Sequence, residues 1–344
     1  MMKKKIIVTG GTGYIGSHTT VELIEDGFEV VIIDNLYNSE AEVADRIFQI
    51  TGIRPLLAVF DLCDREKLQS FLQSQGNIDG IIHFAAYKAV GESVNKPLEY
   101  YRNNLLSLIN LLEAMKTCGI PNLVFSSSCT VYGQPAKLPV AEDAPVQPAM
   151  SPYGNTKQIG EEIIRDTAAA TEKIKAIALR YFNPIGAHPS ALIGELPRGV
   201  PENLVPYITQ TAYGLRKELK VFGNDYNTPD GSCIRDYLHV VDLAKAHVTA
   251  VKRLVENKNK SDYEVFNLGT GMGVSVLEAI KSFERVTGIN LNYQITGRRA
   301  GDIEKIWADP SLANRELGWR TVSTLDESMK TAWEWEKYIR KDKK

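Results

Sequence analysis

Cysteine is scarce in this sequence. Only 4 of the 344 residues are cysteine, and they lie far apart, at Cys63, Cys118, Cys129 and Cys233. No two of them form a CxxC pair, so the sequence lacks the paired ligands of a cysteine-based zinc site, and we expect no bound metal. Isolated cysteines are typical of proteins kept in a reducing compartment, and we therefore expect a cytoplasmic protein.

Long apolar runs are also missing. No stretch approaches the roughly 20 apolar residues that are needed to cross a bilayer. The first apolar run, Ile6–Val8, gives way to glycines within two residues, which makes it too short for the apolar core of a secretion signal. We therefore expect a soluble protein without a membrane partner.

The sequence has no excess of charge of either sign. Lys and Arg number 40 against 42 for Asp and Glu, giving a net charge of −2. This balance excludes a generic attraction to nucleic acid or to anionic membranes, so an anionic ligand must be held by local groups. The apolar fraction of 44% supports an ordinary packed core, and 344 residues suit one large domain or two closely joined ones.

The first half of the chain alternates short apolar runs with longer amphipathic stretches. The runs expected to be strands are Lys5–Val8, Glu29–Ile33, Leu56–Phe60, Gly80–Phe84, Asn122–Phe125 and Ile174–Tyr181. The stretches expected to be helices are Gly16–Asp26, Ala41–Thr51, Asp64–Gln75, Pro97–Cys118 and Pro152–Ala170. The runs are too uniformly apolar for a sheet with one wet face. The pattern predicts an α/β fold with a doubly wound, parallel, Rossmann-type sheet, whose ligand sits beyond the carboxyl ends of the strands.

After Phe182 the alternation breaks down, and the segment 183–231 is rich in proline and glycine. Elements expected beyond it are short helical pieces around Pro201–Leu215, helices at Asp242–Glu256, Ser275–Thr287 and Leu325–Arg340, a strand at Glu264–Leu268, and an irregular segment at Gly297–Asp309. We interpret residues 1–182 as the sheet domain, with part of 236–270 returning to it. Residues 183–344 are then mainly a smaller α/β cap domain that closes over the ligand crevice.

A glycine-rich turn follows the first strand and opens a helix. It reads Gly10-Gly11-Thr12-Gly13-Tyr14-Ile15-Gly16. Glycines there let the backbone turn tightly and approach a pyrophosphate, which lies on the N-terminus of the helix. The spacing of Gly10, Gly13 and Gly16 departs from GxGxxG, so by itself the turn also fits an ordinary glycine-rich loop.

Asp34 strengthens the dinucleotide interpretation. It ends the second strand about 20 residues after the glycines, where a carboxylate can accept both ribose hydroxyls of an adenosine. A carboxylate would repel a 2′-phosphate, so the sequence predicts NAD rather than NADP. We expect the following residues to line the same site: Asn35, Leu36, Asn38 and Ser39.

A Tyr-x-x-x-Lys pair lies near the start of a predicted helix, after Ser151 as N-cap and Pro152 in the first turn. Tyr153 and Lys157 are four residues apart and share one helical face. A cation beside the phenol lowers its pKa from about 10, and an oxidised nicotinamide would add to this effect. Tyr153 could then act as a general base near neutral pH. Without context, a surface tyrosine and a solvated lysine would explain the pair equally well.

The serine run Ser126-Ser127-Ser128 at the end of the fifth strand supplies that context. A hydroxyl presented there faces the Tyr–Lys helix and can bind a substrate hydroxyl and help its proton move. We expect Ser128 to have this role. Serines at a strand end usually satisfy the backbone of the turn, and this role stays open for Ser126 and Ser127. Ser126 is also counted among the cofactor-binding residues.

Together these motifs resemble the extended short-chain dehydrogenase/reductase family. Longer strings are similar to the UDP-glucose 4-epimerase (UDP-galactose 4-epimerase) branch of that family, and they run in order along the chain between Lys4 and Trp335. The strings are HFAAYKAVGESVNKPLEYYRNN, SSSCTVYG, SPYGNTK, RYFNPIGAHPS, FGNDYNTPDGSCIRDYLHVVDLA and RRAGDIEKIWAD. Several of them lie in the substrate half, outside the shared NAD motif.

The resemblance implies the site residues. Besides the glycine turn with Tyr14 and Ile15, the Asp34 loop, Tyr153 and Lys157, it places further residues at the cofactor: Asp61, Leu62, Phe84, Ala85, Ala86, Lys88, Asn103, Tyr181 and Phe182. The residues implied to hold the UDP-sugar, besides Ser128 and Tyr153, are Asn183, Asn203, Leu204, Val221, Phe222, Arg235, Arg299, Asp302 and Ile306. Two arginines suit a pyrophosphate, which they can bind through several charge-assisted bonds.

The resemblance also implies a reaction. Tyr153 as phenolate takes the C4-hydroxyl proton while hydride passes to NAD, and Ser128 orients or relays the proton. Lys157 holds the phenolate and the nicotinamide ribose. The 4-keto sugar turns over while UDP stays anchored, and hydride returns to its other face, so NAD remains bound. A homodimer through the helices Pro97–Cys118 and Pro152–Ala170 is a further expectation of the family.

Alternatives remain open at this stage. Family members restricted to unacetylated sugars often carry tyrosine at the position of Ile306, and a smaller residue accompanies acceptance of 2-acetamido sugars. Isoleucine is intermediate, so epimerisation of UDP-GlcNAc and UDP-GalNAc stays possible, as does a simple packing role. A dehydratase is disfavoured because Cys129 and Thr130 stand where those relatives commonly carry Asp-Glu. A UDP-uronate epimerase or decarboxylase is less well excluded. A non-catalytic NAD sensor is disfavoured because Tyr153, Lys157 and Ser128 are all present.

Overall fold

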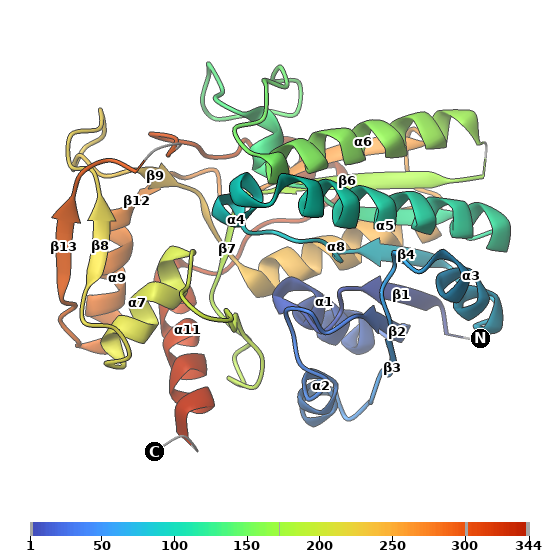
Figure 1. Ribbon diagram of the computed structural model, residues 1–344, viewed down its shortest axis with the longest axis horizontal. Helices are drawn as coiled ribbons and strands as arrows, with labels where there is room; N and C mark the ends of the chain where they lie inside the picture. The colour runs from blue at the N-terminus through green and yellow to red at the C-terminus, as the bar shows by residue number, and fades with distance from the viewer. Residues whose placement is uncertain (1–2, 172, 300–301, 342–344) are drawn as a thin grey trace.

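Seven parallel strands form the centre of the molecule, in the computed structural model shown in Figure 1. The structure describes residues 3–171, 173–299 and 302–341. Two parts of the sequence interpretation reach beyond these residues. Ala300 and Gly301, within the segment expected to be irregular, and the lysine-rich tip at 342–344 lie outside the described residues.

The sheet has the order β11-β6-β5-β4-β1-β2-β3, and every neighbouring pair is parallel. Its strands are β1 (Lys5–Thr9), β2 (Glu29–Asp34), β3 (Leu56–Val59), β4 (Gly80–His83), β5 (Asn122–Ser126), β6 (Lys175–Tyr181) and β11 (Tyr263–Leu268). From β1 the chain first builds outward through β2 and β3, then returns to add β4, β5 and β6 on the other side. This reversal creates a crevice at the carboxyl ends of β1 and β4, where ligands of doubly wound sheets bind. The predicted Rossmann-type fold is confirmed.

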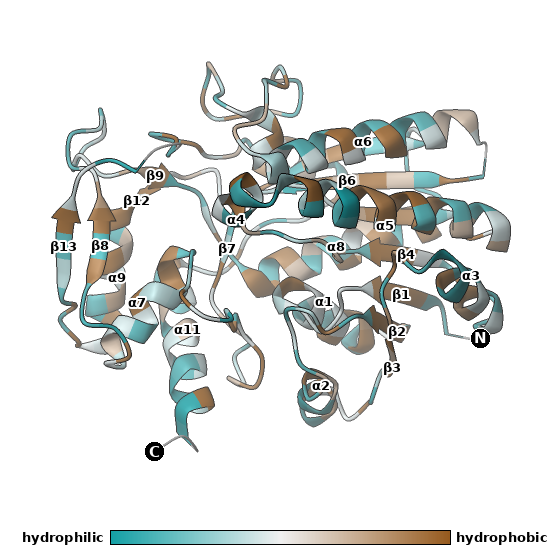
Figure 2. Ribbon diagram, viewed as in Figure 1, coloured by the Kyte–Doolittle hydropathy of each residue, from teal (hydrophilic) through white to brown (hydrophobic). Residues whose placement is uncertain are grey.

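The middle residues of the inner strands are mostly apolar because both faces of the sheet are covered there. Along β1, Ile6 and Val8 pack into one core while Ile7, between them, packs into the other, and all three are fully buried. Successive side chains of a strand point to opposite faces, so a strand buried on both sides needs an apolar residue at every position. Figure 2 shows this as brown ribbons along the central strands.

Helices cover both faces of the sheet (Figure 1). One core joins the sheet to α1 (Tyr14–Glu25), α2 (Val43–Thr51) and α8 (Val240–Val255). The other joins it to α3 (Arg65–Ser74), α5 (Pro97–Cys118) and α6 (Pro152–Ala170). Three short elements were not predicted, since each has six residues or fewer: α4 (Val90–Asn95), the 3₁₀ turn η1 (Cys129–Tyr132) and α10 (Ser311–Glu316).

The cap has a separate core, formed by Ile208, Phe283 and Met329 among others. Its helices are α7 (Leu204–Ala212), α9 (Val276–Thr287) and α11 (Leu325–Arg340). Its strands pair in twos: β7 (Asn183–Ile185) with β10 (Tyr237–His239), β8 (Leu219–Phe222) with β13 (Tyr293–Thr296), and β9 (Ile234–Arg235) with β12 (Val274–Ser275). None of these strands was predicted, because runs of two to four residues carry too little periodicity.

The chain crosses between cap and sheet more than once. After the cap strands β9 and β10, helix α8 packs on α1, and β11 pairs with β6. The boundaries 1–182 and 183–344 remain a prediction, since nothing tests where one domain ends. In the part of the chain that the structure describes, no helix combines the length and apolar character that a membrane span requires.

Candidate active site

The glycine turn between β1 and α1 is shaped by close backbone approach. Gly10 has a φ of 71°, and a Cβ on it would lie 2.8 Å from the backbone nitrogen of Ala85, at the end of β4. A Cβ on Gly16 would overlap the Gly10 carbonyl. Gly13 is the N-cap residue of α1, and within the described residues no side chain caps that end. The first N–H groups of the helix are therefore left for an anionic ligand, as a pyrophosphate site requires.

The Asp34 carboxylate lies at the end of β2 and organises the loops around it. Its Oδ2 accepts a hydrogen bond from the Thr12 backbone N–H at 3.1 Å. Its Oδ1 accepts from the Leu36 N–H at 2.9 Å and from the Ser39 hydroxyl at 3.1 Å. One side chain thus fixes both the glycine turn and the loop that follows β2. Thr12 was not singled out from the sequence, although it lies inside the glycine motif.

The other residues expected around the adenosine differ in what they offer. Asn35 donates to Asp61 Oδ2 at 3.1 Å, so these two side chains form one polar edge beside the loop. Asn38 is exposed, and Asn103 donates to its neighbour Asn104 at 2.9 Å. Leu62 is different, because its side chain packs in the core beneath the sheet. A cofactor could reach only the backbone of Leu62.

Tyr153 and Lys157 lie on the first turns of α6, where the Ser151 hydroxyl caps the helix by accepting from the Gly154 N–H at 3.1 Å. Both side chains are at least nine-tenths buried. The Lys157 ammonium donates to the Ser126 carbonyl oxygen at 2.6 Å and lies 5.9 Å from the centroid of the Tyr153 ring. Helix α6 is thereby tied to the end of β5, and the phenol and the lysine share one side of the site.

The charges of this pair follow mainly from burial. Burial lowers the pKa of Lys157 to about 8, while Glu161 opposes the shift. Burial also raises the pKa of Tyr153, with Tyr181 adding to the rise and a hydrogen bond with Ser128 opposing it. The sequence prediction that Lys157, together with an oxidised nicotinamide, lowers the pKa of this phenol stays a prediction. The Lys157 ammonium bonds the Ser126 carbonyl oxygen rather than the phenol oxygen.

Behind the lysine lies a buried ion pair that sequence reasoning missed. Arg180 on β6 donates to Glu161 on α6 through Nε at 2.9 Å and Nη2 at 2.5 Å. Arg180 Nη1 also donates to the Tyr132 hydroxyl at 2.9 Å, which in turn donates to Asn267 at 2.7 Å. The network joins α6, η1, β6 and β11. Its sequence signal was the four-residue spacing from Lys157 to Glu161, which continues the same helical face.

The three serines at the end of β5 have different partners. Ser126 Oγ and the Tyr181 hydroxyl lie 2.5 Å apart, and Ser127 donates to Glu161 at 2.5 Å. Of the roles left open for Ser126 and Ser127, the structure shows hydroxyl contacts to side chains of β6 and α6 rather than to the backbone of the turn. Ser128 caps η1, accepting from the Thr130 N–H at 3.2 Å.

Position 129 carries no carboxylate and no reactive thiolate. Burial raises the pKa of the Cys129 thiol to about 12, so it stays neutral near pH 7. Thr130 follows it in η1. An acid–base pair for expelling a substrate hydroxyl is thus missing from the place where a dehydratase would have it.

The remaining residues expected at the cofactor lie at and just after the ends of β4 and β6. Phe84 packs on His247 of α8 with ring centroids 4.6 Å apart, and Ala85 is the residue that Gly10 approaches. Phe182 is buried just after β6. The ammonium of Lys88 pairs with Glu195 Oε1 at 3.0 Å. This last contact joins the NAD half to the cap.

The residues expected at UDP come from several parts of the cap. Arg299 pairs with Asp302 at 2.7 Å, and its guanidinium lies 5.2 Å from the centroid of the Phe222 ring. Arg235 donates to the Ile234 carbonyl at 2.8 Å, and within the residues described it has no carboxylate partner. Asn203 is the N-cap residue of α7, directly before Leu204, and its amide donates to Glu195. Two cations and one helix N-terminus are thus available for a diphosphate.

Three residues implied for the substrate differ in what they leave free for a ligand. The side chain of Val221 is 1% exposed in the cap core, so only its backbone can meet a ligand. Ile306 packs in a buried cluster with Tyr132 and Phe182, which agrees with the packing role that the sequence left open. Asn183 donates its backbone N–H to the Asp236 carbonyl at 3.0 Å, which leaves its side chain available.

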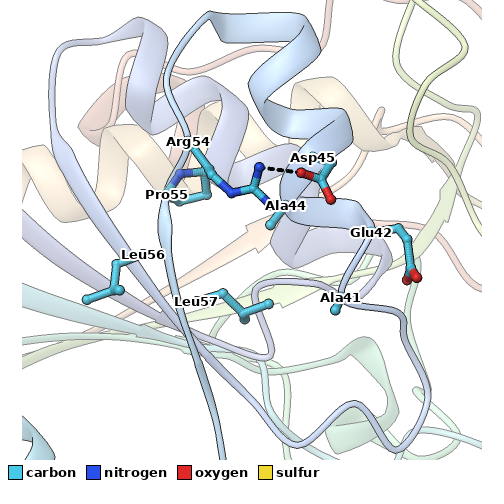
Figure 3. A pocket seen from close by; sticks show the side chains of 8 residues that line it. All are labelled: Ala41, Glu42, Ala44, Asp45, Arg54, Pro55, Leu56 and Leu57. Atoms are coloured by element: carbon cyan, nitrogen blue, oxygen red, sulfur yellow. Dashed lines mark ion pairs between the residues drawn. The ribbon is translucent and has the colours of Figure 1, made fainter.

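A separate hollow of about 580 Å³ lies between α2 and β3 (Figure 3). Its lining includes the ion pair of Arg54 with Asp45 and the exposed strand residue Leu56. None of its lining residues belongs to the predicted site. In the residues that the structure describes, no three His, Cys, Asp or Glu side chains gather as metal ligands would.

Comparison with known proteins gives one consistent result. Residues 6–269 match the NAD dependent epimerase/dehydratase family. The chain is 50% identical over 332 residues to the UDP-glucose 4-epimerase of Yersinia enterocolitica, covering 96% of this chain and 97% of that protein. A crystal structure of UDP-glucose-4-epimerase from Stenotrophomonas maltophila, with bound NAD and formylated UDP-arabinopyranose, has a TM-score of 0.94 at 48% identity and covers 98% of both chains. The UDP-glucose 4-epimerase of Bifidobacterium longum in complex with NAD+ and UDP has a TM-score of 0.93 at 45% identity, covering 97% of this chain and 98% of that one.

Proposed function

Because the chain belongs to the NAD dependent epimerase/dehydratase family, we propose that it inverts the C4 hydroxyl of UDP-hexoses and interconverts UDP-glucose and UDP-galactose. The observation that carries this proposal is the similarity to UDP-glucose 4-epimerases, which is 50% identity over 96% of this chain. This similarity includes the cap as well as the NAD half. The cap is where a substrate is chosen, so similarity there supports the reaction rather than the fold alone.

The residues present fit NAD. The tight turn at Gly10 and Gly16 leaves no room for side chains, and the start of α1 is free of side-chain caps within the described residues, as a bound pyrophosphate requires. Asp34 ends β2 where the adenosine ribose would lie. When bound, NAD supplies the hydride acceptor and donor for C4 of the sugar.

The chain's own groups handle the proton. Tyr153 accepts the proton of the C4 hydroxyl as hydride leaves that carbon, and returns it when hydride comes back. Ser128, at the end of β5 and the start of η1, orients the same hydroxyl. Lys157 supplies positive charge from the same helix face, 5.9 Å from the ring centroid. Since burial raises the pKa of the phenol, its action as a base depends on positive charge brought close to it.

Inversion also requires that the sugar turn while the nucleotide stays. The groups that would hold the diphosphate and uridine are Arg235, the Arg299–Asp302 pair and the start of α7 at Asn203. In this proposal the charged groups bind the nucleotide, while Ser128 and Tyr153 are the polar groups at C4. Few bonds to the sugar leave it free to present either face.

A coupled assay for conversion of UDP-galactose to UDP-glucose, run on purified protein without added NAD, tests this function. We expect turnover, because the cofactor is regenerated within each cycle. No conversion by protein shown to carry NAD would overturn the proposal. A parallel reaction with UDP-GalNAc tests the second substrate class, which the intermediate size of Ile306 leaves open.

We further propose a cytoplasmic homodimer. The outward face of α5 carries Leu98, Leu106 and Ile109, which are 78%, 39% and 40% exposed. Such a row on a long helix beside α6 suits a second copy of the same surface. All four cysteines are free thiols, which suits a reducing compartment.

A further inference from the structure

One arginine of the cap reaches across to the loop that follows β2. Arg198 Nη1 donates to the Tyr37 carbonyl at 2.7 Å, and its Nη2 donates to the carbonyls of Ser39 at 2.6 Å and Leu36 at 3.3 Å. The two segments are about 160 residues apart in the chain. A single side chain therefore joins three backbone oxygens of the loop 34–39 to the segment 194–203, which we name the strap.

The loop 34–39 depends on such contacts for its shape. Leu36 has a φ of 58°, in the left-handed region that side chains other than glycine rarely adopt. Conformations of this kind persist when the surroundings fix them from several sides. The Leu36 N–H donates to Asp34, and its carbonyl accepts from Arg198. The peptide groups on both sides of the strained residue are thus held, one from the NAD half and one from the cap.

The strap is fastened at other points as well. Glu195 Oε1 pairs with Lys88 at 3.0 Å and accepts from Asn203 at 2.7 Å. The Glu195 carbonyl accepts from Trp335 of α11 at 2.8 Å. The strap therefore joins residues predicted at the cofactor (Lys88) and at the UDP-sugar (Asn203) to the loop predicted at the adenosine. Arg198 makes the hydrogen bonds that join the strap to the loop at the adenosine end.

The chemistry of this contact is specific to arginine. A guanidinium presents several N–H donors in a rigid fork and can bind several carbonyl oxygens at once, whereas an ammonium is a point charge on a flexible stem. Within the described part of the chain, no carboxylate forms an ion pair with Arg198. The side chain is exposed, yet its donors are directed at backbone oxygens of one loop. An ordinary surface ion pair does not explain this arrangement.

We propose that Arg198 is a positioning residue that retains NAD, by holding the loop 34–39 in the shape that receives the adenosine. It acts through Asp34 and Leu36 and takes no part in the chemistry at C4. This proposal rests on the cofactor site of the proposed function. Its consequence is kinetic: the fastened loop slows the escape of NAD, while proton and hydride transfer are unaffected.

The test compares the parent protein with Arg198→Gln and Arg198→Lys, and with Arg315→Gln as a matched control. Arg315 is an exposed arginine of α10, which packs on β11 at the opposite edge of the sheet from β2 and β3. Each protein is purified with its NAD, and release is followed by trapping free NAD with a glycohydrolase. We expect release to be about tenfold faster in Arg198→Gln, the change expected when hydrogen bonds to a charged group are lost. Arg198→Lys should also release NAD faster than the parent, because one ammonium cannot replace the fork.

Two further readouts separate retention from general damage. The melting temperature of the NAD-stripped proteins and kcat at saturating NAD should be the same in the parent and in Arg198→Gln. Equal release rates in the two proteins would overturn the proposal, as would a drop in melting temperature of the stripped variant that accounts for faster release. A parent protein that carries no NAD at all would instead overturn the cofactor site, and the proposal with it.

Discussion

The ammonium of Lys157 lies 2.6 Å from the carbonyl oxygen of Ser126, so the lysine is fixed to the end of β5 rather than to the phenol of Tyr153. This bond sets the position of α6 against the sheet and keeps a positive charge beside the site. Burial lowers the pKa of Lys157 to about 8 and raises the pKa of Tyr153. Proton transfer at C4 therefore depends on the protonation states of both residues. The first two predictions follow from this relationship.

Replacing Tyr153 by phenylalanine should remove the base and leave the fold and the NAD site intact. The side chain is buried and keeps its volume, so the melting temperature should change little. Turnover of UDP-galactose should fall by about 10²–10⁴-fold, the usual contribution of a general base. Bound NAD, measured after acid extraction, should stay at parent level. Activity equal to that of the parent would refute the role of Tyr153.

Activity should decline as the pH rises above about 8, the value to which burial lowers the pKa of Lys157. Above it the amine is neutral and no longer stabilises a phenolate. The measurement is a profile of kcat against pH. In Lys157→Arg the alkaline decline should move to higher pH, because a guanidinium keeps its charge. An identical alkaline limb in the two proteins would show that another group titrates.

Breaking the Glu161–Arg180 pair should affect both stability and the pH profile. Glu161→Gln leaves the Arg180 guanidinium buried without its counter-charge, which costs about 3–5 kcal/mol. Glu161 also raises the pKa of Lys157, so its loss should move the alkaline decline to lower pH. Urea unfolding and the same kcat profile measure the two effects. The double change Glu161→Gln with Arg180→Met should recover stability. A pH profile that does not move in Glu161→Gln would show that Glu161 does not act on Lys157.

Glu22 on α1 should destabilise the protein at alkaline pH. Burial raises its pKa to about 7, with Lys245 opposing the shift. A carboxyl whose pKa is higher in the folded state contributes stability below pH 4.5, and that contribution is lost as the pH rises through 7. Glu22→Gln should therefore stabilise the protein at pH 8 by about 1 kcal/mol, a value reduced for partial exposure. At pH 4 it should have no effect. Melting temperatures at both pH values, with the exposed Glu25→Gln as control, test this.

The oligomeric state is open to a simple test. Light scattering should give the parent a mass near twice 38.3 kDa. Leu106→Lys on the outer face of α5 should give the monomer, because it places a charge in the proposed interface. The control, Val322→Lys, changes a residue that is 75% exposed away from α5 and should leave the dimer intact. A parent that runs as a monomer would contradict the proposal.

The sheet and its ligand crevice were predictable because their signals are local. Uniformly apolar runs such as Ile6–Val8 belong only in a strand covered on both faces, and the glycine turn and Asp34 mark where the crevice opens. The paired cap strands β8 and β13 were not predictable. They have four residues each and owe their existence to pairing across about 70 residues.

The contacts of the site residues were only partly predictable. The four-residue spacing from Tyr153 to Lys157 predicted that these side chains share one face of a helix. The same spacing continues to Glu161, which therefore lies on that face as well. Contacts between residues that are far apart in the sequence have no local sequence pattern that predicts them. The hydrogen bonds of Arg198 to the loop after β2 are an example. The same limit explains Val221, whose side chain faces the cap core although its strand borders the expected UDP site.

The central claim is that hydride leaves C4 of the sugar, is held by the enzyme's own NAD, and returns to the same carbon. UDP-galactose carrying deuterium at C4, converted by the purified protein in ordinary water, tests it directly. The account predicts UDP-glucose that keeps its deuterium at C4, since the hydride never meets solvent. Product with hydrogen at C4 would show exchange with water and would contradict it.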